Sequence, residues 1–496
     1  KSYKFDLSKQ GHTYTLVLMV TSTAIGGTLQ YGYNLAIMNA PTVFIQNFVN
    51  ETFLERWGIQ LRVYEVTLIW TFIVSIFSLG GFIGALIAGP MSVRFGRKKT
   101  MLLNNVFLLS SSLLALLSRT AKSFEMIIIS RFLVGINAGT VCPMYFGESA
   151  PKHLRWAVSL SSAVFTSFGL VLGQVVSLRE LLSSEPCWQY LFASNAIPGL
   201  IQLLTLPWFP ESPRYLLIDC GDKEACQWRL RGCEVQREEL DEILQEQNET
   251  KGERAKQLWE LFTDRSVRWQ LITVAVLSSV MQLCGNDSIY FYASYVFQEA
   301  GISAEQIQYV TIGTGMCEFT ACILCNLLIE RLGRLMLMDG YVLMAGWAVV
   351  FTVALSLENM VTWMPYLSMT CIFTYILSFG MGPVTGILPT EIFNQTTHPA
   401  TYMAAGSLMW LNLFIIGMIF PFLVSGLGQY CFVPFGAVCL LTASYIQMVL
   451  PETKRKTLSM ITKEFYRLSY HGQVKMDPEG KQAQYQLGEI FHSTAL

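Results

Sequence analysis

Four polar candidate residues lie close together in one largely apolar stretch of the chain, LITVAVLSSVMQLCGNDSIYFY: Gln282, Asp287, Ser288 and Tyr292. In a bilayer, a carboxylate near the midplane costs roughly 2.5 to 3.5 kcal/mol on insertion scales, so it faces the protein interior or water. Four polar groups exceed what the packing of one helix requires. We therefore expect this cluster to bind a polar solute. A second acid, Glu318, lies in the next apolar stretch.

Three interpretations of Asp287 remain open. It is a protonated, neutral hydrogen-bond partner of a bound solute, a proton-coupling group, or a structural acid bonded to a neighbouring helix. If Asp287 and Glu318 are close, they titrate as a pair. Under the first interpretation Asp287→Asn preserves transport, and under the second it removes the dependence of transport on pH.

Other apolar stretches carry single polar or amphipathic side chains that can join such a site. Each also has a structural alternative, because polar residues within membrane helices bind neighbouring helices. These candidates are Gln30, Tyr33, Asn34, Gln174, Thr385, Trp410 and Asn412.

The composition is that of a polytopic membrane protein. The chain is 52% hydrophobic and 14% charged, and its mean hydropathy is +0.41, against about 25% charged residues in an average soluble domain. The net charge of −1 argues against a nucleic-acid partner. The twelve cysteines show no metal-site spacing, so we expect buried thiols and no metal.

Windows of about 20 apolar residues, enough to cross about 30 Å of hydrocarbon, predict twelve membrane helices. We therefore expect an all-α fold with a six-helix half at 1–208, a cytoplasmic helical linker at 209–268, a second half at 269–450 and a tail at 451–496. The windows are 14–34, 66–88, 101–118, 124–143, 156–176, 187–208, 269–292, 306–329, 336–356, 363–388, 401–425 and 428–450.

The distribution of Lys and Arg predicts the orientation. Basic residues concentrate in RFGRKK (94–99), KHLR (152–155), the central linker, RLGR (331–334) and KRK (454–456), which places both termini in the cytoplasm. Of four N-x-Ser/Thr sequons, only the one at Asn50 falls in a long outer loop, so Asn50 is the expected glycosylation site.

Two sequence features recur at matching places in the two halves. GPMSVRFGRKK after the second window returns in weakened form as NLLIERLGRL after the eighth, and ESPRYLL after the sixth returns as PETKRKT after the twelfth. Duplicated halves of this kind meet at a substrate site near the midplane, and one half rocks against the other.

Eight motifs now become diagnostic: QYGYN, GRKK, GESAPKHLR, PESPR, QLCG, ERLGR, PTEIF and PETK. In this order they resemble the facilitative glucose transporters of the major facilitator superfamily, and within it the fructose-type class. The pair LIDCGDKEAC and QLCGNDS is similar to one particular member. The resemblance covers nearly the whole chain and implies a sugar carrier.

The resemblance assigns roles to individual residues. Gln282 matches a sugar-binding glutamine, Phe291 and Tyr292 match an outer gate, and Trp410 matches a tryptophan below the sugar ring. Recognition of a neutral sugar needs uncharged donors and acceptors together with aromatic faces.

Basic and acidic residues at the cytoplasmic ends are expected to form a latch that breaks when the transporter opens inward; the alternative is that the cations only anchor the topology. The latch residues are Arg94, Arg97, Lys98, Glu148, Arg155, Glu211, Arg214, Glu330, Arg331, Arg334, Glu391 and Glu452.

Several positions depart from the family pattern. Met281 and Ala163 replace glutamines, and acids stand at Asp287 and Glu318 where the family has amides. Trp156 and Leu335 also differ, and the segments NAGTVCPMY and GPVTGILPTE are shorter than in the fructose-type relatives. A shift of two residues turns a helical face by roughly 160° unless glycine or proline breaks the helix. The departures put transport competence in question.

The expected function is a hexose uniporter for fructose or glucose, acting without a cofactor and as a monomer in the cell membrane, with an intracellular vesicle pool as an alternative. Proton-coupled sugar symporters of this fold carry an acid after Gly-Tyr in the first span, and this position is Asn34 here. Alternatives are a carrier of urate or a polyol, a proton-coupled symporter, and a non-transporting sugar sensor. No Lys or Arg lies in the mid-span cluster, which argues against an organic anion.

An enzyme is the least expected class. None of the five histidines lies beside a candidate nucleophile within a span, and no Gly-rich phosphate loop of the P-loop type is present.

Overall fold

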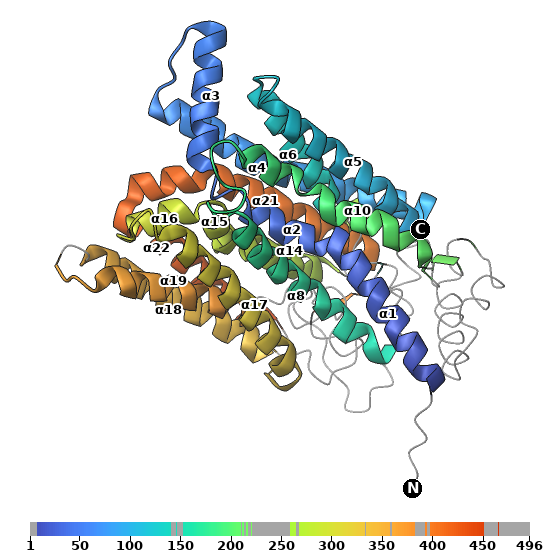
Figure 1. Ribbon diagram of the computed structural model, residues 1–496. Coiled ribbons are helices and arrows are strands. Elements are labelled where there is room, and N and C mark those ends of the chain that lie inside the picture. The colour runs from blue at the N-terminus through green and yellow to red at the C-terminus, as the bar shows by residue number, and fades with distance from the viewer. Residues whose placement is uncertain are drawn as a thin grey trace.

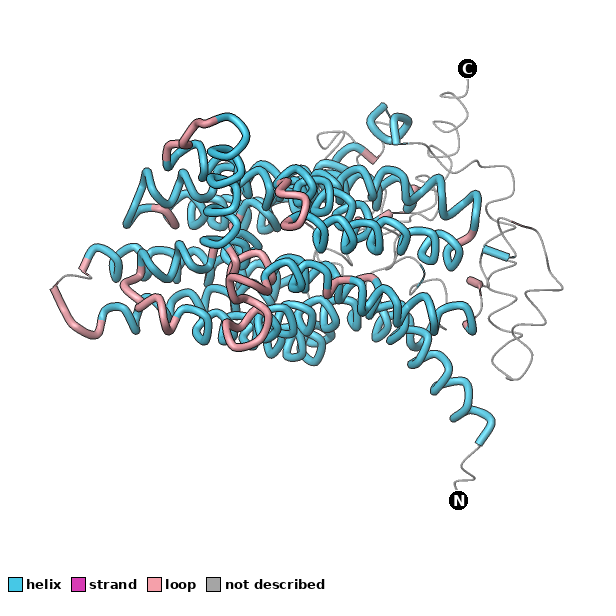
Figure 2. The backbone as a smooth tube through the Cα atoms, turned by 45° about the horizontal axis from the view of Figure 1, so that its top comes forward, coloured by secondary structure: helices cyan, strands magenta, loops and turns pink. Residues whose placement is uncertain are grey.

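The computed structural model describes residues 7–139, 145, 152–209, 211–212, 215–216, 220, 258–263, 267–332, 334–357, 360–381, 392–393, 397–450 and 465. Within these residues the chain forms helices and connecting turns and no strand. The helices run side by side as a long bundle (Figures 1 and 2). This part of the structure agrees with the all-α expectation.

The first group of helices, here called the N-terminal bundle, extends from α1 to α10. Its first predicted window contains two helices, because the chain breaks at Gly27. The members are α1 (Leu7–Gly26), α2 (Thr28–Ala36), α3 (Thr42–Trp57), α4 (Val63–Phe95), α5 (Arg97–Ser118), α6 (Phe124–Ala138), α8 (Lys152–Val176), α9 (Trp188–Ala193) and α10 (Ala196–Thr205), followed by the 3-10 turn Leu206–Trp208.

The second group, here called the C-terminal bundle, follows the short helix α13 (Leu258–Thr263), the one helix described within the predicted linker. Its members are α14 (Arg268–Leu283), α15 (Asn286–Phe291), α16 (Ala293–Glu299), α17 (Ile307–Leu332), α18 (Arg334–Ser356), α19 (Met364–Met381), α21 (His398–Leu427) and α22 (Val433–Val449), with the 3-10 turn Gly428–Tyr430 before α22.

The two bundles repeat one set of helix pairings. In the N-terminal bundle α4 packs on α6, α6 on α5, and α2 on α8; in the C-terminal bundle α17 packs on α19, α19 on α18, and α14 on α21. Two further pairs join the bundles, α4 with α21 and α8 with α17. The pairings fit the internal repeat that the motifs predict, and they make these four helices the walls of the junction.

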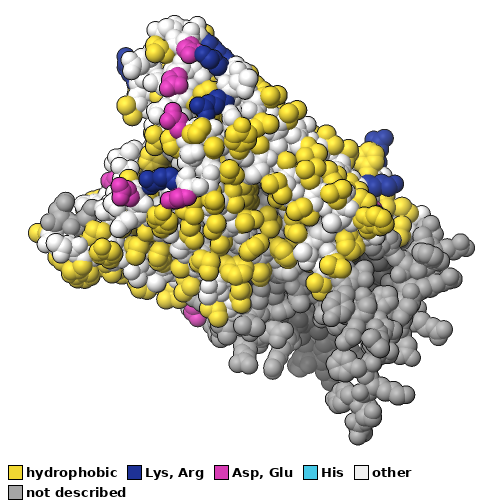
Figure 3. Space-filling model, viewed as in Figure 1, with side chains coloured by type: hydrophobic (Ala, Val, Ile, Leu, Met, Phe, Trp, Pro, Cys, Tyr) yellow, Lys and Arg dark blue, Asp and Glu magenta, His cyan; other side chains and the backbone are white. Residues whose placement is uncertain are grey.

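The exterior of the bundle is suited to a lipid environment. Five helices among the described residues are long and apolar enough to span a membrane, within Val63–Ser92, Arg97–Ser118, Ile307–Cys325, Leu337–Ser356 and Ala400–Tyr430. Hydrophobic side chains cover most of the visible middle of the molecule, while charged side chains gather near α3 and at the opposite end (Figure 3). Helices also occupy the other predicted windows, but that all twelve cross the bilayer stays a prediction.

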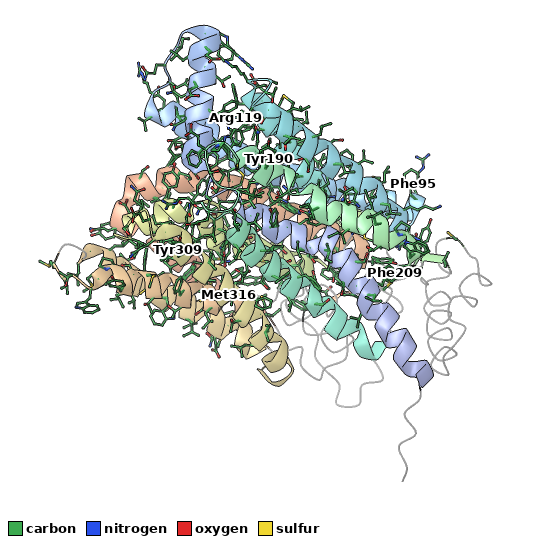
Figure 4. All side chains as sticks on the ribbon, viewed as in Figure 1. Phe95, Arg119, Tyr190, Phe209, Tyr309 and Met316 are labelled. Atoms are coloured by element: carbon green, nitrogen blue, oxygen red, sulfur yellow. The ribbon has the colours of Figure 1, made fainter. Side chains whose placement is uncertain are left out.

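The predicted cytoplasmic motifs and the predicted outer loops lie at different ends of the bundle, and which end faces the cytoplasm stays a prediction. Phe95 and Phe209, next to the predicted cytoplasmic motifs, lie toward one end, and Arg119 lies toward the other (Figure 4). The Lys98 ammonium donates to the carbonyls of Pro207 and Phe209 at 2.8 and 2.6 Å, which joins the α4–α5 turn to the end of α10. We call the end of Arg119 and α3 the outer end.

Helix α3 stands at the outer end and is held by ion pairs. Arg56 donates to Glu125 at 2.7 Å, and Lys122 donates to Glu55 at 2.8 Å. The sequon residue Asn50 lies within α3, where its side-chain oxygen accepts a hydrogen bond from the Leu61 backbone N–H at 3.2 Å. Glycosylation at Asn50 stays a prediction.

A candidate solute site at the junction of the two bundles

The helix in the seventh predicted window is broken at Gly285, and this break positions Asp287. Helix α14 ends at Leu283, Gly285 adopts a left-handed conformation (φ 80°), and α15 begins at Asn286. A side chain at Gly285 would collide with the Phe435 ring, with a Cβ 2.9 Å from the nearest ring atom. Tyr375 donates to the carbonyl of Cys284 at 2.6 Å, which satisfies an acceptor freed at the break.

Asp287 lies in the first turn of α15 and faces the N-terminal bundle. The Tyr31 hydroxyl of α2 donates to its Oδ2 at 2.9 Å. Asp287 is only 5% exposed, so this hydrogen bond is one of the few ways its charge is stabilised. A polar contact therefore crosses between the two bundles at their centre.

The second acid, Glu318 of α17, joins the same network through Asn286. The Asn286 amide nitrogen lies 3.4 Å from Asp287 Oδ1 and 3.5 Å from Glu318 Oε2, and Tyr290 donates to Glu318. The two carboxylate oxygens are therefore within about 7 Å, where two full charges repel by about 2 kcal/mol at an effective dielectric of about 20. Within the described residues no Lys, Arg or His forms an ion pair with either acid.

Gln282 is fully buried beside these groups, yet its amide is unpartnered. Its side chain lies next to Tyr31 and Asp287, but neither its Nε2 nor its Oε1 has a hydrogen-bond partner of good geometry. The Ser288 hydroxyl and Asn286 Oδ1 are also buried without partners. Buried polar atoms are nearly always paired in proteins, so these atoms have hydrogen-bonding capacity that the described residues leave unused.

Three aromatic rings, those of Tyr31, Phe77 and Trp410, lie together beside this network. The Tyr31 ring meets Trp410 of α21 edge-on at 5.3 Å, and Phe77 of α4 lies 5.5 Å from Trp410. A Cβ on Gly81 would lie 2.3 Å from the Trp410 ring, so only glycine lets α4 approach α21 here. Aromatic faces beside unpartnered polar atoms are the combination that a sugar ring requires.

Gln30 and Asn34 point into the N-terminal bundle and away from the Asp287 network. The Asn34 amide donates to Asn195 Oδ1 at 3.0 Å, and Gln30 donates to the Asn195 carbonyl at 2.9 Å. Arg131 donates to Asn34 Oδ1 at 3.1 Å, and its guanidinium lies 4.7 Å from the Phe77 ring centroid. The contacts of Gln30 and Asn34 in this structure are those of helix packing.

Arg131 is a buried cation that lies outside the mid-span cluster of residues 282–292. It is 2% exposed and contacts Asn34, one of the candidates. No described carboxylate lies within ion-pair distance of it. Amide and carbonyl oxygens and an aromatic face balance its charge instead.

Three further candidates have partners in the structure. Gln174 crosses between the bundles and donates to Thr314 at 3.1 Å. Asn412 donates to Ser279 at 3.1 Å within the C-terminal bundle, and the Tyr33 hydroxyl lies 2.5 Å from that of Ser194 within the N-terminal bundle.

The two expected gate residues are both fully buried. Tyr292 stacks on Phe420 with ring centroids 5.7 Å apart and donates to the Gly417 carbonyl at 2.8 Å. Phe291 lies edge-on to Tyr292 at 6.2 Å. In this conformation the rings are packed inside the protein.

Hydrogen bonds join the bundles at the outer end. Asn39 accepts the Ser294 backbone N–H at 2.8 Å, and Gln46 donates to Tyr295 at 2.9 Å. Tyr309 donates to Glu180 at 2.8 Å. A hydrogen bond from its own backbone N–H and then the one from Tyr309 hold the pKa of the Glu180 carboxyl below its usual range. These contacts hold the two bundles together at this end.

The described latch residues make contacts within the N-terminal bundle. Glu211 accepts the Lys98 backbone N–H at 3.0 Å, so its carboxylate satisfies a free donor at the start of α5. Arg97 lies over the Tyr215 ring at 4.9 Å, and Arg94 is exposed. That these contacts act as a latch, which breaks when the transporter opens inward, stays a prediction.

Some candidates lie outside the described part of the chain. Residues Glu148, Arg214, Thr385, Glu391 and Glu452 are among them, as are the side chains of Arg155, Glu330, Arg331 and Arg334.

The sequence analysis missed residues that complete the network: Tyr31, Asn286, Tyr290, Asn195 and Arg131. Helical periodicity offered a signal for two of them. Asn286 and Tyr290 are four residues apart and share the face that meets Glu318.

Comparisons with known proteins agree with this geometry. The sequence pattern of the family described as "Sugar (and other) transporter" matches residues 19–465. The human facilitated glucose transporter member 11 is 51% identical over 464 residues, covering 92% of this chain and 94% of that protein. The bovine facilitated glucose transporter member 5 is 41% identical over 471 residues, covering 92% and 93%.

Among solved structures, the major facilitator superfamily proton:xylose symporter XylE, bound to 6-bromo-6-deoxy-D-glucose, is similar with a TM-score of 0.75. It is 22% identical, and the match covers 92% of this chain and 99% of that one. The partially occluded inward-open form of the E. coli xylose transporter XylE is similar with a TM-score of 0.74 and 23% identity, covering 90% and 100%. At this identity the likeness concerns the fold.

These findings confirm the resemblance drawn from the motifs, including the pair LIDCGDKEAC and QLCGNDS. The relatives are transporters and not enzymes. The chain is a membrane protein with the major facilitator fold, and it belongs to the sugar transporter family, among its facilitated glucose transporters.

Proposed function

We propose that this protein is a facilitative hexose uniporter that carries fructose, glucose or both by alternating access. Its two six-helix halves, 1–208 and 269–450, rock about a site at their junction. In this proposal all twelve windows cross the membrane, both termini face the cytoplasm, Asn50 carries a glycan, and the working unit is a monomer in the cell membrane. No cofactor takes part.

The observation that carries the proposal is the unpartnered Gln282 amide at the junction of the bundles. It lies beside Asp287 and Tyr31, with the Trp410 ring near Tyr31. A sugar hydroxyl both donates and accepts, so it satisfies both ends of an amide that lacks partners. The groups come from α2, α14, α15 and α21, so a bound sugar bridges the two bundles.

Uniport is supported by the position of Asn34. An acid at position 34 would lie beside Arg131. The charge of this acid would change with pH, which is a means of proton coupling. Asn34 has no such titration, and its amide oxygen already accepts from Arg131 at 3.1 Å. The two conformations therefore exchange without a proton at this position.

Proton-coupled symport is the second candidate, and the Asp287–Glu318 pair is the observation that favours it. Two carboxyls within about 7 Å bind protons as a coupled unit, whose occupancy changes with the environment. In this alternative the pair replaces the acid that the first span lacks.

The test is solute exchange by the purified protein in sealed proteoliposomes. Vesicles loaded with unlabelled fructose or glucose take up labelled hexose by exchange, and urate and a polyol are added as competitors. Stronger competition by a hexose than by urate or the polyol supports the proposal. Binding of hexose without exchange supports a sensor instead, and stronger competition by urate or the polyol overturns hexose as the substrate.

A further inference from the structure

The short helix α15, which carries Asp287, is anchored at its first end by another helix of the same bundle. In an unbroken helix the Ser288 backbone N–H would donate to the Cys284 carbonyl. No such bond is present among the described backbone hydrogen bonds, and the Tyr375 hydroxyl of α19 donates to this carbonyl instead, at 2.6 Å. Cys284 and Tyr375 are both buried. The hydroxyl therefore takes the place of the missing backbone donor.

The other end of α15 is anchored by Tyr292, the residue that follows it. The Tyr292 hydroxyl donates to the Gly417 carbonyl of α21 at 2.8 Å, and its ring stacks on Phe420 with centroids 5.7 Å apart. Helix α21 in turn packs on α4 of the N-terminal bundle. Both ends of α15 are thus held by hydrogen bonds from tyrosine hydroxyls to backbone carbonyls.

A chain of buried aromatic rings connects these two anchors. The Tyr375 ring lies edge-on to Phe432 with centroids 5.7 Å apart, and Phe432 lies 5.6 Å from Phe435. Phe435 stacks on Phe420 at 5.9 Å, and Phe420 stacks on Tyr292. Rings within about 7 Å of each other in these orientations attract one another. The two anchors therefore belong to one packed unit.

The anchor at Cys284 affects the junction because Asp287 lies only three residues further along the chain. Asp287 accepts the Tyr31 hydroxyl of α2 at 2.9 Å, which is a polar contact between the two bundles. Without the Tyr375 hydroxyl, the Cys284 carbonyl and the Ser288 N–H are both free to pair as in an ordinary helix. A helix that continues along the axis of α14 no longer places Asp287 where the break places it.

We propose that Tyr375 is a positioning residue of the transport site, whose hydroxyl keeps the break between α14 and α15 open and thereby holds Asp287 against Tyr31. The inference rests on the proposed function, because it concerns the same junction. It adds that the affinity for hexose depends on a hydroxyl of α19 that acts through Cys284 and Asp287 and not on the solute.

Tyr375→Phe tests the hydroxyl, because it keeps the ring and removes the donor. Initial rates of labelled fructose and glucose uptake into proteoliposomes give a half-saturation concentration and a maximal rate. We expect the half-saturation concentration to rise about two- to tenfold, the effect of one neutral hydrogen bond. A variant that only folds less well lowers the maximal rate and leaves the half-saturation concentration unchanged.

Tyr445→Phe is the matched control for this change. The Tyr445 hydroxyl lies 3.1 Å from that of Thr273 in the same bundle, about three helical turns before the break. We expect its half-saturation concentration to equal that of the unmodified protein. An unchanged half-saturation concentration in Tyr375→Phe, or an equal rise in both variants, overturns the inference and leaves the proposed function intact.

Combination with Tyr31→Phe tests whether Tyr375 acts through Asp287. In the Tyr375→Phe protein Asp287 is no longer held against Tyr31, so adding Tyr31→Phe should change the half-saturation concentration less than about twofold. In the Tyr445→Phe protein, Tyr31→Phe should keep the full effect that it has alone. Equal effects of Tyr31→Phe in the two backgrounds, or no effect in the unmodified protein, overturn the inference.

Two further measurements cover the cases in which these variants cannot be read. If Tyr375→Phe yields no folded protein, Phe432→Leu replaces it, because it leaves the hydroxyl and removes the ring against which Tyr375 packs. The effect of Tyr31→Phe should again shrink in this background, and an undiminished effect overturns the inference.

If the unmodified protein takes up no hexose, the proposed function fails, and hydrogen exchange of backbone amides in the purified protein decides the inference. Peptides that cover residues 284–292 should exchange faster in Tyr375→Phe than in the unmodified protein, because α15 loses an anchor. They should exchange at the unmodified rate in Tyr445→Phe. Equal or slower exchange in Tyr375→Phe overturns the inference.

Discussion

At the scale of single residues, the junction combines groups that satisfy each other with groups that do not. Asp287 accepts a hydrogen bond from the Tyr31 hydroxyl, Glu318 accepts one from the Tyr290 hydroxyl, and the Gln282 amide beside them has no hydrogen bond of good geometry. In a low-dielectric interior the first two interactions fix side-chain positions, while the third leaves binding capacity for a solute. The position of Tyr31 at this junction makes it a direct test of the site.

Tyr31→Phe should weaken hexose binding, because Asp287 loses its donor from the N-terminal bundle. A hydrogen bond to a charged group is worth about 1.5 to 3 kcal/mol, and less between membrane helices. We expect the half-saturation concentration for hexose uptake to rise about five- to thirtyfold, measured as initial rates in proteoliposomes.

The matched control for this change is Tyr33→Phe, since the Tyr33 hydroxyl meets Ser194 within the N-terminal bundle. An equal rise of the half-saturation concentration in both variants would mean that loss of a hydroxyl disturbs the fold. No rise in Tyr31→Phe would show that Tyr31 does not contribute to hexose binding.

The sequence predicted part of this site and could not have predicted the rest. Asp287, Gln282 and Glu318 stood out because acids and amides are rare in apolar windows. Gln30 and Asn34 share one helical face, and Tyr31 lies about 100° around the same helix. Both faces pack against protein, so composition alone cannot tell which one meets the other bundle. Arg131 was not anticipated because the partners of its guanidinium are two neutral oxygens of Asn34, which is far from it in the sequence.

At the scale of elements, breaks and close approaches position the site. The break at Gly285 points α15 toward the N-terminal bundle, and Gly81 lets α4 pack against Trp410 of α21. The helices themselves were predictable from apolar windows of about 20 residues. The packing partners of each helix could not be predicted, because apolar windows are alike in composition. Only the structure shows which glycines lie where two helices cross.

Gly81→Ala should destabilise the junction of α4 and α21. The added Cβ would lie 2.3 Å from the Trp410 ring, and overpacking of this kind typically costs about 1–3 kcal/mol. We expect a lower melting temperature of the purified protein, followed by size-exclusion chromatography after heating.

Gly346→Ala in α18 is the control for Gly81→Ala, because nothing lies within 4 Å of its added Cβ. Equal melting temperatures for Gly81→Ala and Gly346→Ala would contradict the close approach of α4 to α21.

Asn39→Ala should favour opening at the outer end. The change leaves the half-buried Ser294 backbone N–H without its acceptor and removes one of the contacts between the bundles. With Cys187 replaced by Ser, a cysteine introduced by Phe291→Cys should react faster with a membrane-impermeant maleimide in the Asn39→Ala protein. Phe291 is fully buried in this structure. If the introduced cysteine reacts at the same rate with and without Asn39→Ala, the hydrogen bond between Asn39 and Ser294 does not restrict opening at this end.

At the scale of the whole molecule, the repeated pairings explain how one site serves both sides of a membrane. The pairs α4 with α21 and α8 with α17 form the main contacts between the two bundles, and α2 also meets α15. In the proposed function, sliding along these contacts moves the bundles as rigid bodies, and a solute held by groups from both would remain between them. In this conformation hydrogen bonds join the bundles at the outer end, so exchange requires those bonds to break.

The most direct measurement is uptake of labelled fructose and glucose by the purified protein in sealed proteoliposomes, with and without an inward proton gradient. The account predicts saturable uptake that stops when the internal and external concentrations are equal and that does not depend on the gradient. Accumulation above the external concentration, driven by the gradient, would contradict uniport and make Asp287 and Glu318 coupling groups. Absence of saturable uptake of either sugar would contradict the central claim that the junction carries hexose.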